Sequence, residues 1–155
     1  MAGLVQFRSQ HPVCPELDRQ TARPIGDVVG LFARARAAGA KVAVCASAGR
    51  SVSEAGLRIL GVEADALVCG DDPVSSRPSP EPLWRVCHQV GATSDRAVMV
   101  GDTAADIHSG INAKFGEVIG VLSGGGTAAS LRAADRVLER ADRLRWDPRA
   151  GTVGH

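Results

Sequence analysis

Short apolar runs alternate along the chain with segments whose apolar residues recur at helical spacing. Continuous apolar runs of this kind predict strands that are buried on both faces of a sheet. The expected strands are residues 4–7, 41–47, 66–70, 96–101, 117–122 and a short final one at 136–139. The expected helices are residues 25–38, 51–60, 81–90 and 103–113, and a fifth formed from 123–134.

This alternation predicts an α/β fold, a doubly wound, Rossmann-like parallel sheet of about five to six strands flanked by helices. We expect a single domain over residues 1–144, with residues 145–155 as a loose tail because they show little apolar periodicity. Ligands of such sheets bind outside the carboxyl ends of the strands. The residues that directly follow each strand are therefore the ones to search for chemistry.

Composition narrows the classes of function. The net charge is +1 and the aromatic share is 3%, so nothing indicates a nucleic-acid partner. No apolar run approaches the roughly 20 residues of a membrane span, and no secretory leader is visible, so we expect a cytoplasmic protein without a membrane partner. The four scattered cysteines predict reduced, packed thiols and no zinc site. The oligomeric state is left open.

Polar residues follow the second and third expected strands. Ser47 comes after the second, where its hydroxyl can bind a phosphate oxygen or cap the next helix. Arg77 lies in a proline-rich loop after the third, where it can neutralise a phosphoryl group or lie solvated. Asp71 and Asp72, earlier in that loop, fit turn chemistry better than metal binding.

Two aspartates follow the fourth expected strand in the stretch VMVGDTAADIHSG. Asp102 directly follows the strand, and Asp106 lies four positions on, hence on the same face of the next helix. Carboxylates at the edge of a parallel sheet suit Mg²⁺, which takes hard oxygen ligands. The alternative is a helix N-terminus that favours negative charge, with Asp102 or Thr103 as the cap. The glycines at 124–126 either border a pocket or only cap a helix.

The combination of Ser47, the Arg77-Pro78-Ser79-Pro80 loop, and Gly101-Asp102 with Asp106 resembles the haloacid dehalogenase-like superfamily. Residues 22–144 are similar to its phosphoglycolate-phosphatase type. The resemblance implies Mg²⁺-dependent hydrolysis of the phosphate ester of a small metabolite. Ser47 and Arg77 would then hold the phosphoryl oxygens, while Asp102 and Asp106 held the metal ion.

The family's first motif, D-x-D-x-T/V, supplies its aspartate nucleophile and its acid–base aspartate, and it occurs nowhere in the 155 residues. If Phe7 is aligned with the family's pattern, Arg8 stands at the nucleophile position and Gln10 at the acid–base position. A guanidinium can neither attack phosphorus nor bind Mg²⁺. Only polar, proline-containing sequence separates Val13 from Ile25, so no cap domain is expected.

Three explanations of this missing motif stay open. Residues 1–24 are the degenerate start of a member that binds without turnover, or they belong to a truncated or mis-joined form of an active enzyme, or a partner chain completes the site. Under each, we expect impaired catalysis and weak or absent Mg²⁺ binding in the chain as it stands. A non-catalytic phosphate-binding or protein-interaction module is the alternative function. Phosphonate chemistry, suggested by arginine at position 77, lacks a suitably placed lysine.

Overall fold

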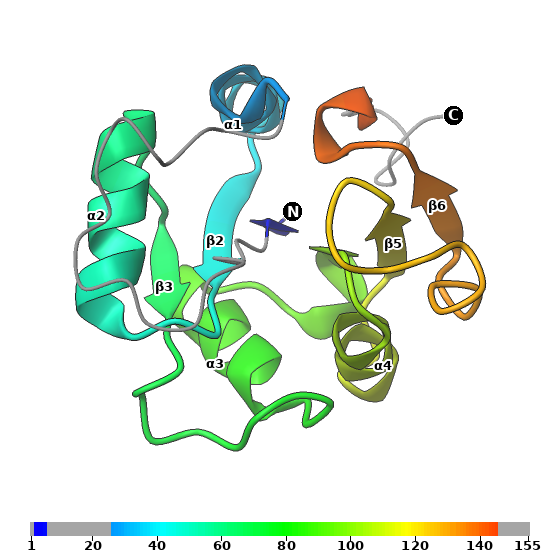
Figure 1. Ribbon diagram of the computed structural model, residues 1–155. Coiled ribbons are helices and arrows are strands. Elements are labelled where there is room, and N and C mark those ends of the chain that lie inside the picture. Colours follow the sequence, from blue (N-terminus) through cyan, green and yellow to red (C-terminus); the bar gives the residue numbers. More distant parts are fainter. Residues whose placement is uncertain (1, 6–25, 146–155) are drawn as a thin grey trace.

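The computed structural model describes residues 2–5 and 26–145, and within 2–5 only the backbone. All strand pairs are parallel, and the strands form a six-stranded sheet in the order β3-β2-β1-β4-β5-β6 (Figure 1). The order reverses beside β1, as in a doubly wound sheet. The predicted fold class and strand number are confirmed.

The strands and helices follow the predicted pattern closely. The strands are β1 (Ala2–Val5), β2 (Lys41–Cys45), β3 (Ala66–Val68), β4 (Ala97–Gly101), β5 (Glu117–Val121) and β6 (Arg136–Leu138). The α-helices are α1 (Val28–Ala37), α2 (Arg50–Leu60), α3 (Glu81–Val90) and α4 (Ala104–Asn112). Two 3-10 turns, Ser94–Arg96 and Ala141–Arg143, precede β4 and follow β6.

The apolar strands face a helical layer on each side of the sheet. Val42 and Val44 of β2 pack with α1, whereas Ala43 and Cys45 point to the opposite face, which α3 and α4 cover. Figure 1 shows α1 on one side of the sheet and α3 and α4 on the other. Because successive side chains of a strand alternate between faces, covering both faces requires an unbroken apolar run. This is the pattern that the sequence shows.

Glycines end α2 and α3, the helices that precede and follow β3 in the chain. Gly61 follows α2 with a φ of 67°, and Gly91 follows α3 with a φ of 69°. The left-handed conformation lets each glycine amide donate to carbonyls of the last helical turn, and residues with a β-carbon rarely adopt it. The ends of α2 and α3 at residues 60 and 90 agree with the predicted helices 51–60 and 81–90.

Two predicted elements differ in the structure. The first strand occupies Ala2–Val5, two residues earlier than the predicted 4–7, and residues 6 and 7 lie outside the described residues. The helix predicted from 123–134 is wrong, because only a turn forms there. Leu131 donates to Thr127 within that turn, and Asp135 then exchanges two hydrogen bonds with Val118 of β5. This pairing leads the chain into β6 directly after the turn.

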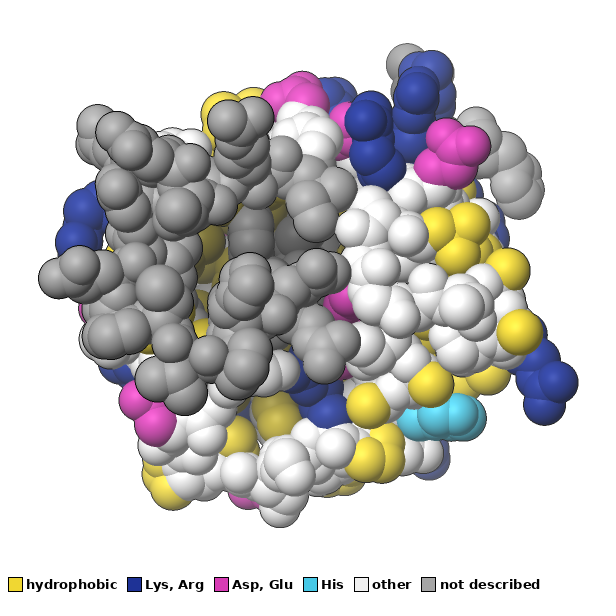
Figure 2. Space-filling model, viewed as in Figure 1, with side chains coloured by type: hydrophobic (Ala, Val, Ile, Leu, Met, Phe, Trp, Pro, Cys, Tyr) yellow, Lys and Arg dark blue, Asp and Glu magenta, His cyan; other side chains and the backbone are white. Residues whose placement is uncertain are grey.

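The described surface carries mixed charge. On the face shown in Figure 2, basic and acidic side chains lie among uncharged ones rather than in separate fields. Among the helices of the described residues, none combines the length and the apolar character that crossing a membrane would demand.

Candidate functional site

The carboxyl ends of β2, β3 and β4 place the predicted site residues at one edge of the sheet. Ser47 lies two residues beyond β2, Arg77 lies in the loop between β3 and α3, and Asp102 directly follows β4. Gly70 brings the first two loops together, since a β-carbon on Gly70 would overlap the carbonyl oxygen of Ser47. The loops that carry Ser47 and Arg77 therefore approach each other closely.

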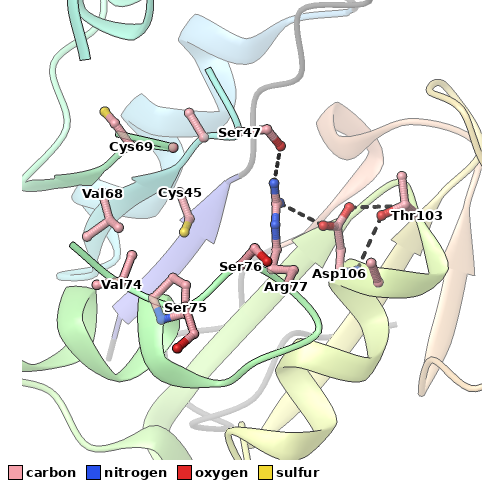
Figure 3. Close-up of a pocket in the computed structure, with 14 residues that line it drawn as sticks. Cys45, Ser47, Val68, Cys69, Val74, Ser75, Ser76, Arg77, Thr103 and Asp106 are labelled. Carbon is pink, nitrogen blue, oxygen red and sulfur yellow. Dashed lines mark hydrogen bonds and ion pairs between the residues drawn. The ribbon is translucent and has the colours of Figure 1, made fainter. Parts of the chain in front are cut away.

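The Arg77 guanidinium joins two of the other predicted residues. Its Nη1 donates to Asp106 Oδ1 at 2.7 Å, and its Nη2 donates to the hydroxyl oxygen of Ser47 (Figure 3). The Arg77 side chain is only 12% exposed, so it is not the solvated loop arginine of the alternative interpretation. Ser47 does not cap α2 either, because Gly49 occupies that position. Ser47, Arg77 and Asp106 thus form one connected cluster.

Asp106 also fixes the start of α4. Its Oδ2 accepts a hydrogen bond from the Thr103 amide at 3.0 Å, while the Thr103 hydroxyl accepts from the Asp106 amide at 3.3 Å. This reciprocal pair is a capping box, which satisfies two amides that the helix itself leaves free. The prediction of Thr103 as a possible cap is confirmed. The Asp106 carboxylate therefore serves the helix and Arg77 together.

Burial shapes the electrostatics of this cluster. Asp106 is 1% exposed, and burial raises the pKa of its carboxyl group although the nearby Arg77 cation opposes that rise. Burial likewise raises the pKa of the Cys45 thiol, at the end of β2, to about 11. Cys45 is thus a packed, neutral thiol near neutral pH, as the sequence predicts.

The loop that carries Arg77 is held in place on both sides. The Ser109 hydroxyl and the Asn112 amide, both on α4, donate to the Ser79 and Pro78 carbonyl oxygens at 2.6 and 3.1 Å. At the other end, Glu81 accepts a hydrogen bond from the Ser75 amide at 2.8 Å. These anchors fix the loop from which the guanidinium extends toward Asp106.

Asp102 lies beneath the glycine loop that follows β5. Its Oδ2 accepts a hydrogen bond from the Gly125 amide at 2.8 Å. A β-carbon on Gly124 would overlap the Asp102 carboxylate, and one on Gly126 would overlap the Asp102 carbonyl oxygen. Glycine is therefore required for this close approach. The glycine loop contacts Asp102, but it does not line the cavity beside Arg77 and no helix forms directly after it, so neither of the two sequence interpretations is confirmed.

Asp71 and Asp72 organise the turn after β3, as predicted. Both carboxylate oxygens of Asp71 accept from the Arg50 amide at 3.0 Å, at the first residue of α2. Asp72 accepts from the Cys69 amide at 2.9 Å and from the Arg50 guanidinium at 2.7 Å. Their carboxylates thus tie β3 to α2.

We next ask whether the described residues fit the magnesium ion that the resemblance implies. Both carboxylate oxygens of Asp106 are already bonded, to Arg77 and to Thr103. Asp102 retains Oδ1, which accepts no hydrogen bond from the described part of the chain. No group of three or more histidine, cysteine or acidic residues suited to a metal ion occurs within residues 2–5 and 26–145. These residues alone do not fit the ion, and the metal roles of Asp102 and Asp106 stay predictions.

The cluster opens into a cavity of about 320 Å³. Sequence inspection missed most of the residues that line it. They come from the ends of β2 and β3, the loop before α3 and the starts of α3 and α4, and include Val68, Val74, Ser75, Ser76, Pro82 and Ala105. Ser75 and Ser76 directly precede Arg77, and this position in the sequence is the signal that could have placed them in the lining. Arg8 and Gln10, at the predicted nucleophile-motif positions, lie outside the described residues.

The family model for haloacid dehalogenase-like hydrolases matches residues 2–114 of this chain. The chain belongs to the haloacid dehalogenase-like hydrolase family. The family match and the geometry agree, because the segment that the family model covers contains Ser47, Arg77, Asp102 and Asp106.

Two curated relatives carry phosphatase-type names. The pyrophosphatase PpaX of Halalkalibacterium halodurans is 35% identical over 77 residues, which cover 48% of this chain and 36% of the relative. The N-acetylmuramic acid 6-phosphate phosphatase of Pseudomonas aeruginosa is 45% identical over 47 residues, 30% of this chain and 21% of the relative. The matched segments span about a third or less of these two relatives. The substrates that their names give therefore apply to those proteins.

Solved structures share the fold. A hydrolase from Pseudomonas syringae superimposes with a TM-score of 0.68 at 27% identity, covering 76% of this chain and 57% of that one. A predicted phosphoglycolate phosphatase from Haemophilus somnus gives a TM-score of 0.69 at 21% identity, covering 77% and 54%. The second likeness speaks for the fold alone.

Proposed function

We propose that this chain is a phosphatase-family domain that binds the phosphate esters of small metabolites and hydrolyses them very slowly or not at all. The observation that carries the proposal is the hydrogen bond between Arg77 and Ser47 at the carboxyl edge of the sheet. Two donors from separate loops converge there at the place where α/β sheets bind ligands. The phosphatase names of the relatives support the same class of ligand.

The chemistry of the two side chains suits a phosphoryl group. A guanidinium offers five N–H donors, and Arg77 directs one nitrogen to Asp106 and another to Ser47. A phosphate oxygen arriving between the loops can accept from the nitrogen that now faces Ser47 and from the Ser47 hydroxyl. Asp106 meanwhile keeps the guanidinium oriented, so the binding geometry is largely preformed.

We expect slow or absent turnover because the chain lacks the aspartate pair with which this family attacks phosphorus. Hydrolysis in this family begins with attack by an aspartate, and the 155 residues contain no D-x-D motif. Asp106 is bonded through both oxygens and Asp102 through one, so each serves the fold. In another nucleophile enzyme, removal of the attacking residue lowers turnover about a millionfold. We expect a comparable deficit here.

A phosphate-release assay tests the catalytic half of the proposal. With Mg²⁺ and p-nitrophenyl phosphate or other generic phosphate esters, we expect no release above the background of a protein-free control. Release that Asp102→Asn abolishes would contradict the proposal, since it would require a complete active site in this chain.

Calorimetry with inorganic phosphate tests the binding half. We expect measurable binding to the wild-type chain and weaker binding to Ser47→Ala, because one hydrogen-bond donor is lost. Ser51→Ala is the matched control, an exposed serine four residues on that does not line the cavity. Absence of heat from the wild type would contradict phosphate binding.

A further inference from the structure

The cavity has its proposed phosphate-binding end at Arg77 and Ser47, and the rest of its lining is of a different chemical kind. Away from the guanidinium, its wall consists of apolar side chains and of hydroxyl groups (Figure 3). Val68, Val74 and Pro82 supply apolar surface, while Ser75 and Ser76 supply hydroxyl groups. A wall of this kind contacts carbon atoms and hydroxyl groups of a ligand rather than ions.

Charge in the cavity lining is sparse and already paired. Among the described residues that line it, Arg77 is the one cation and Asp106 the one anion, and they bond to each other. Outside the lining, the guanidinium of Arg50 is held by Asp72 at 2.7 Å. Within the described lining of the cavity, a second anionic group on a ligand would therefore find no unpaired cation.

Two carboxylates, those of Glu81 and Asp72, are hydrogen-bonded to residues of the lining. Glu81 accepts from the amide of Ser75, and Asp72 accepts from the amide of Cys69; Ser75 and Cys69 both line the cavity. Hydrogen bonds lower the pKa of both carboxyl groups, from Ser75 for Glu81 and from Arg50 for Asp72, so both are anions near neutral pH. Asp72 is paired with Arg50 and Glu81 is exposed to water, so neither attracts a carboxylate or a second phosphate placed in the cavity.

We propose that the cavity selects phosphate monoesters whose organic part is small, uncharged and hydroxylated, and rejects those that carry a second anionic group. This selectivity rests on the proposed function, since it concerns the same phosphate-binding end. The cavity volume of about 320 Å³ lies at the lower end of the roughly 300–1,000 Å³ typical of small-molecule sites. A phosphoryl group with a body of a few carbon atoms matches that size.

Calorimetry with a matched pair of ligands tests the selectivity. Glycerol 3-phosphate and 3-phosphoglycerate differ only in that a hydroxymethyl group of the first is a carboxylate in the second. We expect 3-phosphoglycerate to bind about tenfold more weakly, because its carboxylate would lose hydration beside a lining that offers it no unpaired cation. Pyrophosphate, with a second phosphoryl group, should also bind more weakly than glycerol 3-phosphate.

A charge introduced into the lining should reverse the preference. Ser76 is exposed and lines the cavity, so Ser76→Lys adds a cation without disturbing the core. We expect the ratio of the two dissociation constants to move by about tenfold in favour of 3-phosphoglycerate. Gln89→Lys adds the same charge at an exposed position of α3 outside the lining and should leave the ratio unchanged.

The outcomes separate this inference from the proposed function. If none of the ligands nor inorganic phosphate binds, both the proposed function and this selectivity are wrong. If inorganic phosphate binds but 3-phosphoglycerate binds as tightly as glycerol 3-phosphate, the phosphate site stands and the selectivity is wrong. If Gln89→Lys shifts the ratio as much as Ser76→Lys, net charge rather than the cavity sets the preference, and the inference is overturned.

Discussion

Arg77 donates a hydrogen bond of 2.7 Å to Asp106, a residue that lies 29 positions away in the sequence and is 1% exposed. The pair connects the loop after β3 with the first turn of α4. A cation and an anion that are both largely removed from water depend on each other, because either one alone would be a costly buried charge. The end of the site for which we propose phosphate binding is thus anchored to the buried Asp106.

The buried carboxyl group of Asp106 predicts an unusual pH dependence. Burial raises its pKa above the ordinary value of 3.8, so the folded chain keeps this proton to higher pH than the unfolded chain. The resulting stability is fully present below pH 3.8 and is lost as the pH rises through the folded pKa. The free energy of unfolding of the wild type relative to Asp106→Asn should therefore fall with rising pH. Urea unfolding between about pH 3.5 and about pH 7 measures this difference.

Asp142 provides a control of opposite sign. The Asp27 amide donates to its carboxylate and lowers its pKa, so its contribution is present above the ordinary value of 3.8 and is lost as the pH falls through the lower folded pKa. The free energy of unfolding of the wild type, relative to that of Asp142→Asn, should therefore rise with pH. Equal slopes for the two variants would contradict the assignment for Asp106.

The contact between the glycine loop and Asp102 predicts that Gly124→Ala destabilises the chain. A β-carbon at Gly124 would overlap the Asp102 carboxylate and force one of the two segments to move. We expect a loss of about 1–3 kcal/mol in the free energy of unfolding. Gly56→Ala is the control, since Gly56 lies in α2 with nothing within 4 Å of the added carbon, and should gain about 0.5–1 kcal/mol. Similar effects at the two positions would count against the close approach.

The capping box at α4 predicts a graded response at Thr103. Thr103→Ala removes the hydroxyl oxygen that accepts from the Asp106 amide and should cost about 1 kcal/mol in chemical denaturation. Thr103→Ser keeps the oxygen and should cost much less. If serine and alanine were equally destabilising, the methyl group and not the hydrogen bond would be responsible.

The sequence predicts the sheet well because strands buried on both faces must be apolar, as β4 is throughout and β2 is after Lys41. The failed helix at 123–134 shows the limit of local preference. Alanine, leucine and arginine favour a helix there, but Asp135 binds both the amide and the carbonyl of Val118 and commits the chain to β6. Such pairing between distant segments leaves no local signal.

The sequence predicts which residues lie at the candidate site, but not which groups they bond to. The positions of Ser47, Arg77 and Asp106 after successive strands place them at one edge of the sheet. Whether the Asp106 carboxylate faces a metal ion or a guanidinium depends on the direction in which the loop after β3 runs. That direction is fixed by hydrogen bonds from Ser109 and Asn112, which periodicity cannot show.

The hydrogen bonds that the Asp102 and Asp106 carboxylates already accept lead to a prediction for magnesium binding. A ligand that binds only the folded state raises stability by RT ln(1 + [L]/Kd), so a tight site is visible as a shifted unfolding midpoint. Asp102 has one carboxylate oxygen not bonded within the described residues, and Asp106 has none. We therefore expect about 1 mM Mg²⁺ to leave the urea midpoint where it stands in EDTA. A rise that Asp102→Asn removes would instead reveal a metal site that includes Asp102 and is completed by residues beyond those described.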